Sequence, residues 1–362
     1  MALTVRSLNG DTAFLLTFTP PILKAPLLSP GLFPGSFTIL IDPWLTGPSI
    51  ILNSIFSISH QKIVPCIKSL RDLDHEPDLI LISQDKPDHC HEETLRQLPQ
   101  DCQSTILATP PAAKKILSWK HFRPELVQAL PRFVEEDPKS IYRLVLPPMS
   151  PRGTCGEVTV TWMPAKRDVT GLHHAIGITY RPPCSVLSAN PGYYLDLPMS
   201  PPASPGSPMT IASSPRTIVP SPYNDREKTM SVIYSPHGVA YDIIRPYASS
   251  HLVTESALPL SALIHSFDRV ENPWWLGGNV SAGSPGGLEI ARSLYAGAWI
   301  SAHDADKDNR GISVKQVRIG KFGIEEIMKM FQENQQEHTR RKLPLTNVLS
   351  LASGEEHRIE RR

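Results

Sequence analysis

Cysteine is scarce in this chain, with five residues in 362, and no two of them form a Cys-x-x-Cys pair. They stand far apart, at Cys66, Cys90, Cys102, Cys155 and Cys184. A disulfide framework is therefore not expected, and this usage favours a reducing compartment. Cys90 has no evident paired base, so we expect a buried thiol rather than a nucleophile.

Long apolar runs are also missing. No window approaches the roughly 18 uninterrupted apolar residues of a transmembrane helix. Residues 1–18 are interrupted by Arg6, Asn9 and Asp11, which is not the pattern of a signal peptide. The 36 Lys and Arg balance 35 Asp and Glu, so the net charge of +1 makes no electrostatic case for nucleic acid or an anionic membrane. We expect a soluble, cytoplasmic protein.

Two widespread catalytic motifs are absent. The chain has neither a Gly-x-x-x-x-Gly-Lys-[Ser/Thr] phosphate loop nor a Gly-x-Ser-x-Gly nucleophile elbow. Residues 283–287 are glycine-rich but lack the lysine of a phosphate loop. The motifs therefore give no support to a nucleotide-binding enzyme or a serine hydrolase.

Proline, in contrast, is abundant, with 37 residues. Residues 198–222 hold eight prolines and six serines, too few apolar side chains to fold, so we predict a disordered insertion at about 181–228. Five Ser-Pro pairs in it are possible kinase sites, at Ser200, Ser204, Ser207, Ser214 and Ser221. Residues 335–362 are rich in charge, and we predict a mobile C-terminal tail.

Strand and helix signals alternate in the first part of the chain. Strands are predicted at 37–41, 78–82 and 104–109, with helices at 91–98 and 111–119. Later strand signals follow at 141–146, 156–162, 175–180 and 298–300, and ordered structure is expected to resume at 231–238. This βαβα rhythm predicts an α/β domain with helices outside a sheet.

The stretch 79–91 places a dense group of polar side chains directly after a buried strand. Leu79-Ile-Leu-Ile is followed by Ser-Gln-Asp-Lys-Pro-Asp-His-Cys-His, and a helix begins at once. The rigid end of a strand fixes such a loop, so we interpret it as the active-site corner. The simpler interpretation is that Asp88 only caps the helix and that Lys86 points into solvent.

Five segments, taken in order, carry a resemblance to a known family. They are the strand ending in Asp42-Pro-Trp, the stretch 79–89, Trp162-Met-Pro-Ala, the segment 232–238 and Ala298-Trp-Ile-Ser-Ala-His. This order resembles the metallo-β-lactamase fold, in the broad branch of ascorbate-6-phosphate lactonase and the phospholipase D acting on N-acyl-phosphatidylethanolamine. The resemblance implies an α/β fold, a four-layer αβ/βα sandwich, over residues 1–334.

The family's His-x-His-x-Asp-His metal motif is only half matched. Asp88 and His89 occupy its last two positions, whereas Gln84 and Lys86 stand where its first two histidines belong. The motif is therefore degenerate on its first-metal side.

The other ligand positions show the same contrast between a first metal site whose histidines are missing and a second metal site whose ligands are present. A third histidine of the first metal site would fall near Lys166 or Arg167 and is missing, while His303 matches the last histidine. His237 stands where the family has a bridging aspartate. The resemblance thus implies one Zn²⁺ or another divalent transition metal, or none, with these ligands: Asp88, His89, His237 and His303.

Other side chains are expected to support this site. Lys86 and Arg167 would hold Asp88 ionised and bind an anionic group of the substrate. Asp42 would orient a metal ligand. Two further residues, Gln84 and His265, are weaker candidates for the site. A lone histidine such as His265 is more often a hydrogen-bonded structural residue.

Two functions follow as hypotheses. The first is a metal-dependent hydrolase of a phosphoester, lactone or other ester, with Asp88 aligning or deprotonating water and Lys86 meeting the substrate. The alternative is a catalytically inactive relative that acts as a ligand-binding or scaffold protein. Metal content distinguishes them, since fold alone does not fix function.

Deleting residues 198–222 tests the predicted insertion. If the segment forms no packed core, the deletion should leave the melting temperature within about 2 °C of that of the full chain, because little buried surface is lost. Differential scanning calorimetry measures this, and a large fall in melting temperature would contradict the prediction.

Overall fold

A computed structural model describes residues 1–21, 33–149, 153–166, 168, 170–183, 229–276, 278–333 and 346–361. Most of the predicted insertion and Arg167 lie outside these ranges. Within them, no helix is both long and apolar enough to cross a membrane.

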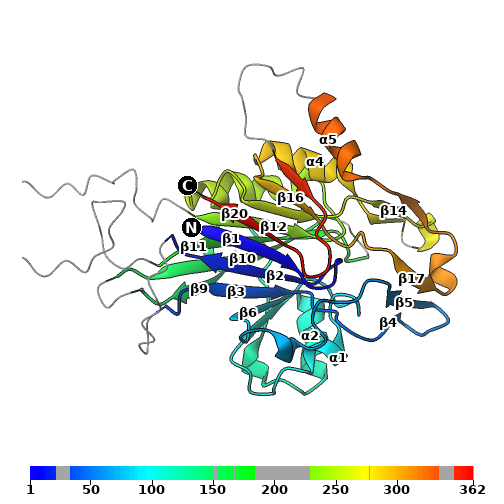
Figure 1. The fold of residues 1–362 in the computed structure, drawn as a ribbon, viewed down its shortest axis with the longest axis horizontal. Coiled ribbons are helices and arrows are strands. Elements are labelled where there is room, and N and C mark those ends of the chain that lie inside the picture. The colour runs from blue at the N-terminus through cyan, green and yellow to red at the C-terminus, as the bar shows by residue number, and fades with distance from the viewer. Residues whose placement is uncertain are drawn as a thin grey trace, which may run out of the picture.

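Two seven-stranded sheets form the centre of the molecule (Figure 1). The first has the order β20-β1-β2-β3-β6-β7-β8. Its strands are β20 (Glu356–Glu360), β1 (Ala2–Ser7), β2 (Phe14–Thr19), β3 (Phe37–Ile41), β6 (Leu79–Ile82), β7 (Thr105–Ala108) and β8 (Val127–Ala129). The strands from β3 to β8 run parallel, whereas β20, β1, β2 and β3 pair antiparallel.

The second sheet has the order β19-β16-β13-β12-β11-β10-β9. Its strands are β19 (Asn347–Leu349), β16 (Ala298–Ser301), β13 (Ala262–His265), β12 (Met230–Ser235), β11 (His174–Arg181), β10 (Gly156–Pro164) and β9 (Tyr142–Leu146). The strands from β19 to β12 are parallel, so their carboxyl ends meet at one edge.

Three apolar clusters explain the layering. The largest fills the space between the sheets, where Leu79 and Leu81 of β6 meet residues such as Val232 and Ile300. Ile80, on the other face of β6, packs in a second cluster with the helices α1 (Glu92–Leu95) and α2 (Pro110–Ser118). Because β6 is covered on both faces, it reads as a continuous apolar run.

The third cluster covers the outer face of the second sheet. Its helices are α3 (Tyr241–Tyr247), α4 (Ser284–Ser293) and α5 (Ile324–Glu333). The order is thus helices, sheet, sheet, helices, and the predicted four-layer α/β sandwich is confirmed (Figure 1).

Two small sheets extend from one end of the sandwich, at the right of Figure 1. One joins β4 (Ser49–Ile51) and β5 (Ser57–Gln61) to β17 (Lys307–Arg310). The other joins β14 (Arg269–Glu271), β15 (Asn279–Ser281) and β18 (Arg318–Gly320). They stand at the end where the polar loops of the large sheets gather.

The C-terminal segment differs from the predicted mobile tail. Residues 346–361 add an edge strand to each large sheet, with β19 parallel to β16 and β20 antiparallel to β1. In β20 the side chains of Glu356, Arg358 and Glu360 are exposed, whereas His357 and Ile359 are half-buried. In the sequence, the charged residues on the exposed face of this edge strand obscured the alternation that is typical of a strand, so the strand was not predicted.

Ending the chain after residue 345 tests the contribution of β19 and β20. We expect the melting temperature to fall by at least about 5 °C, because the strand that pairs with β1 is removed and 1 kcal/mol corresponds to about 2–4 °C in a domain of this size. Substituting alanine for the exposed Glu356 and Arg358 is the control and should change it by less than about 2 °C. A truncated protein that melts like the full chain would refute the expectation.

Candidate metal centre

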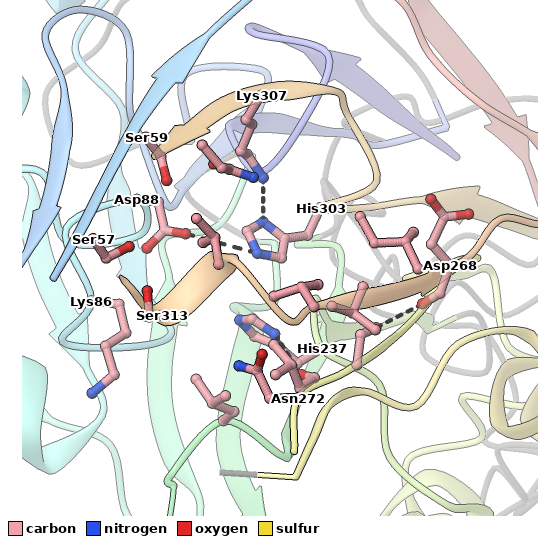
Figure 2. Close-up of a pocket in the computed structure, with 18 of the residues that line it drawn as sticks. Ser57, Ser59, Lys86, Asp88, His237, Asp268, Asn272, His303, Lys307 and Ser313 are labelled. Carbon is pink, nitrogen blue, oxygen red and sulfur yellow. Dashed lines mark hydrogen bonds and ion pairs between the residues drawn. The ribbon is translucent and has the colours of Figure 1, made fainter. Parts of the chain in front are cut away.

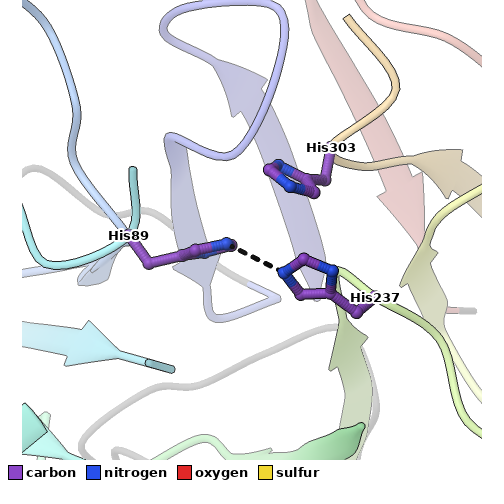
Figure 3. Close-up of side chains that lie close together, drawn as sticks. All are labelled: His89, His237 and His303. Atoms are coloured by element: carbon purple, nitrogen blue, oxygen red, sulfur yellow. Dashed lines mark hydrogen bonds between the residues drawn. The ribbon is translucent and has the colours of Figure 1, made fainter. Parts of the chain in front are cut away.

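Three histidines from both large sheets converge at one end of the sandwich (Figure 3). His89 follows β6 of the first sheet, whereas His237 and His303 follow β12 and β16 of the second. One ring nitrogen from each lies within 4.8 Å of the others, and we call these three residues the histidine trio. The strand ends bring them together because each loop begins at a rigid, buried strand.

The ring orientations of His89 and His237 are fixed by hydrogen bonds at Nδ1. The Nδ1 of His89 lies 2.8 Å from Oδ2 of Asp42, and the Nδ1 of His237 lies 3.0 Å from the carbonyl oxygen of Val280. Both partners are acceptors, so both Nδ1 atoms carry a proton. In the neutral rings the two Nε2 lone pairs then face each other across 3.3 Å. Such an arrangement needs a cation between the nitrogens, either a metal ion or a shared proton.

Asp42 holds His89 through a dense set of contacts. The carboxylate is fully buried and accepts hydrogen bonds from Ser83 N at 2.7 Å, Ser83 Oγ at 2.5 Å and the Tyr234 hydroxyl at 2.7 Å. Its backbone adopts a left-handed conformation, with φ of 42°. Left-handed geometry in a residue other than glycine is costly and recurs at functional sites. Asp42 thus lies where a residue that orients a metal ligand should be.

His303 has different neighbours. Its Nδ1 lies 3.1 Å from Lys307 Nζ, and the same ammonium lies 2.7 Å from Oδ2 of Asp11. Burial raises the pKa of Asp11, but Lys307 and His303 outweigh it and hold that pKa well below its usual range. His303 also has a left-handed backbone, with φ of 65°. A buried Asp–Lys pair therefore occupies the outer side of this ring.

Charge is distributed unevenly over the trio. Burial opposes the charged form of His89, but the carboxylates of Asp88 and Asp42 outweigh it and raise the pKa of His89. Burial, together with His303 and His89, lowers the pKa of His237 well below its usual value. Without a metal, one proton can therefore bridge the two Nε2 atoms, donated by His89 and accepted by His237.

Asp88 lies beside the trio, outside the group of mutually close ligand atoms. Its Oδ2 is 3.8 Å from Nε2 of His303, and its buried Oδ1 has no hydrogen-bond partner among the described residues. Burial raises the pKa of Asp88, but His89, His303 and Lys307 lower it overall, which keeps the carboxylate ionised. The predicted fourth ligand is thus an acceptor next to the three imidazoles.

Other predicted site residues lie farther out. Lys86 is about one-third exposed and pairs with Asp85 at 3.1 Å, so the cation that acts on Asp88 is Lys307. Gln84 is buried and donates through Nε2 to the carbonyl oxygen of Leu172. The predicted charge of Arg167 falls outside the described residues.

His265 is buried but bonds only to backbone in the described structure. Its Nδ1 lies 2.8 Å from the carbonyl oxygen of Ser266, and its Nε2 accepts from the amide of Val239. It supports the turn at Gly238, where a Cβ would lie 2.7 Å from its ring. It therefore shapes the loop that carries His237.

A cavity of about 410 Å³ opens beside His237 and His303 of the trio (Figure 2). His237, His303 and Asp88 lie at its floor, and Lys307 lines it beside His303. Its upper walls come from the two small sheets and from the segment 312–317. Asp11 and Lys307 were missed in the sequence because Asp11 stands in a polar turn and Lys307 in a run of aspartates.

No family model matches the chain, and no curated protein does. Among solved structures, the chain is similar to the metallo hydrolase Igni18 from the archaeon Ignicoccus hospitalis KIN4/I, with a TM-score of 0.45, 11% identity and 100% of both chains covered. It is also similar to an isothiocyanate hydrolase from Delia radicum gut bacteria, with a TM-score of 0.46, 12% identity, and coverage of 99% of this chain and 98% of that one. A third is the metallo-β-lactamase fold protein YhfI from Bacillus subtilis, with a TM-score of 0.42, 12% identity and 98% of both chains covered.

At these identities and TM-scores the similarities do not bear on ligand or reaction. The class of protein is defined instead by its own strands and site, as a two-sheet α/β sandwich with a candidate metal centre at one end. The donor chemistry fits a divalent transition metal, because three imidazoles meet with two lone pairs directed at one point.

Replacing Asp42 with asparagine tests how the ring of His89 is held. Asparagine tolerates the left-handed backbone, so folding should survive, but the negative charge behind Nδ1 is lost. We expect the dissociation constant for Zn²⁺ to rise about 10- to 100-fold, measured by competition with a chromophoric chelator. The exposed Asp242→Asn is the control, and an unchanged affinity in a folded Asp42→Asn protein would refute this role.

Proposed function

We propose that the protein is a metal-dependent hydrolase of an ester bond, whether phosphoester, lactone or carboxylic ester, and that one ion is held by His89, His237 and His303. The observation that carries this proposal is the pair of Nε2 atoms 3.3 Å apart, each fixed by an acceptor at its Nδ1. Three imidazole nitrogens suit Zn²⁺ and leave a coordination position open for chemistry.

When bound, such an ion supplies Lewis acidity and lowers the pKa of a water molecule. The protein's own residues then divide the remaining tasks. Asp42 and the Val280 carbonyl hold the two opposed rings in the ligating tautomer. Asp88 is ionised, partly unpaired and at the cavity floor, so it is the residue to align the attacking water and accept its proton.

One observation favours a different function. A proton shared by His89 and His237 satisfies the opposed nitrogens without a metal, and Lys307 already places a fixed positive charge against His303. In that state the cavity would still bind a small molecule. The alternative is therefore a metal-free ligand-binding protein that does not hydrolyse its ligand.

Metal analysis of the purified full chain distinguishes the two functions. We expect about one equivalent of Zn, Mn, Fe or Ni, directly or after reconstitution, and its loss in His303→Ala. The exposed His60→Ala is the matched control and should keep the metal. Less than about a tenth of an equivalent, with no gain on reconstitution, would overturn the hydrolase proposal.

The same proposal predicts a pH dependence of metal binding. The raised pKa of His89 means that a proton is bound more tightly there than in free histidine, so this proton competes with the metal as pH falls. Zn²⁺ affinity should weaken steadily below about pH 7, and binding should release protons, measured by calorimetry in buffers of different ionisation enthalpy. An affinity that does not change between about pH 5 and 8 would contradict the assignment of His89 as a ligand.

A further inference from the structure

The upper part of the cavity has walls of a different character from its floor. Eight apolar side chains line it, from the hairpin β4–β5, the loop before β11, the sheet β14–β15–β18 and the segment 312–317: Ile51, Phe56, Leu172, Val270, Val280, Val314, Val317 and Ile319. None of the eight is fully buried, so each keeps surface that a ligand could cover. A concave apolar wall beside a few polar groups is the usual construction of a small-molecule site.

The lysines of the cavity are already paired with carboxylates. Each lysine among the described lining residues has a carboxylate partner: Lys86 with Asp85 at 3.1 Å, Lys307 with Asp11 at 2.7 Å and Lys321 with Asp306 at 2.6 Å. The lining also carries four aspartates, namely Asp88, Asp268, Asp304 and Asp306. Each described lysine of the cavity thus already has a carboxylate partner that competes with a phosphate or carboxylate of a ligand.

We propose that this cavity binds the apolar acyl or alkyl group of a neutral carboxylic ester or lactone, with the ester placed over the histidine trio. The inference rests on the proposed hydrolase function and narrows its substrate class. A volume of about 410 Å³ lies in the range of drug-sized ligand sites, so the apolar group has several carbons. Apart from the proposed ion, the described lining offers a strongly anionic phosphoester no lysine without a carboxylate partner.

A chain-length series on the metal-reconstituted full chain tests the proposal. The probes are p-nitrophenyl acetate, butyrate, hexanoate and octanoate, corrected for the rate with His303→Ala. Complete burial of one methylene raises the binding constant about fourfold. A methylene that is only half buried against the wall gains about half of that free energy, which is about twofold. We therefore expect kcat/KM to rise at least tenfold from acetate to octanoate. A flat or falling series would overturn the proposal.

A wall variant locates the effect. Val317→Asp places a charge on the wall at an irregular position outside the strands and should abolish the rise of kcat/KM with chain length. Val145→Asp, on the exposed face of β9, is the matched control and should keep the full rise. Equal chain-length profiles in the two variants would place the apolar group elsewhere and overturn the proposal.

A binding measurement separates this inference from the hydrolase function. Displacement of the neutral fluorophore N-phenyl-1-naphthylamine from the metal-free protein by hexanol, octanol and decanol needs no turnover. Displacement that strengthens with chain length and is lost in Val317→Asp supports an apolar site even if no ester is hydrolysed, in which case only the hydrolase function fails. Turnover of all four esters at equal kcat/KM, with no displacement by any alcohol, leaves the hydrolase and overturns the apolar site.

Discussion

The site depends on one unfavourable contact, the two imidazole lone pairs of His89 and His237 that face each other across 3.3 Å. Two neutral acceptors at that distance repel, and each ring is prevented from turning away by an acceptor behind its Nδ1. The geometry persists only because Asp42 and the Val280 carbonyl are themselves fixed. Asp42 is held by the end of β6 through Ser83 and by β12 through the Tyr234 hydroxyl. The site for a positive charge is thus maintained by Asp42 and the Val280 carbonyl, which contact the ligand rings from behind.

The ring of His303 differs from the other two because its Nδ1 faces a hydrogen-bond donor. Lys307 donates to Nδ1 of His303, so the neutral ring carries its proton on Nε2, the nitrogen that faces Asp88. Binding of an ion by that nitrogen requires the proton to move to Nδ1 and to find Asp11, whose Oδ2 lies 3.6 Å away. Lys307 and a metal ion therefore favour opposite tautomers of His303. The lysine in contact with one of the three rings is thus Lys307, which no sequence motif marks.

Much of the fold could be predicted because its signals are local. The buried run of β6, the apolar strands that end at His237 and His303, and the polar loop after residue 82 all stand out in the sequence. The pairing of Asp11 with Lys307 could not be seen, because 296 positions separate two side chains that only the packed sheets bring together. The ion pair of Lys86 joins it to the adjacent Asp85, a neighbour that the sequence shows without indicating that the two side chains meet. Strand β20 was hidden because an edge strand with one solvated face carries mostly charged residues.

The histidine trio draws one ring from the first sheet and two from the second. Between the sheets the packing is apolar and non-directional, so it resists separation better than it resists sliding. The hydrogen bond from the Tyr234 hydroxyl to Asp42 is a directional contact across that interface. An ion bound by the trio would cross-link the two sheets. It would bind only when the sheets are in the one relative position that brings the three rings together. Binding of the ion and the relative position of the two sheets would then be thermodynamically linked, so that each stabilises the other.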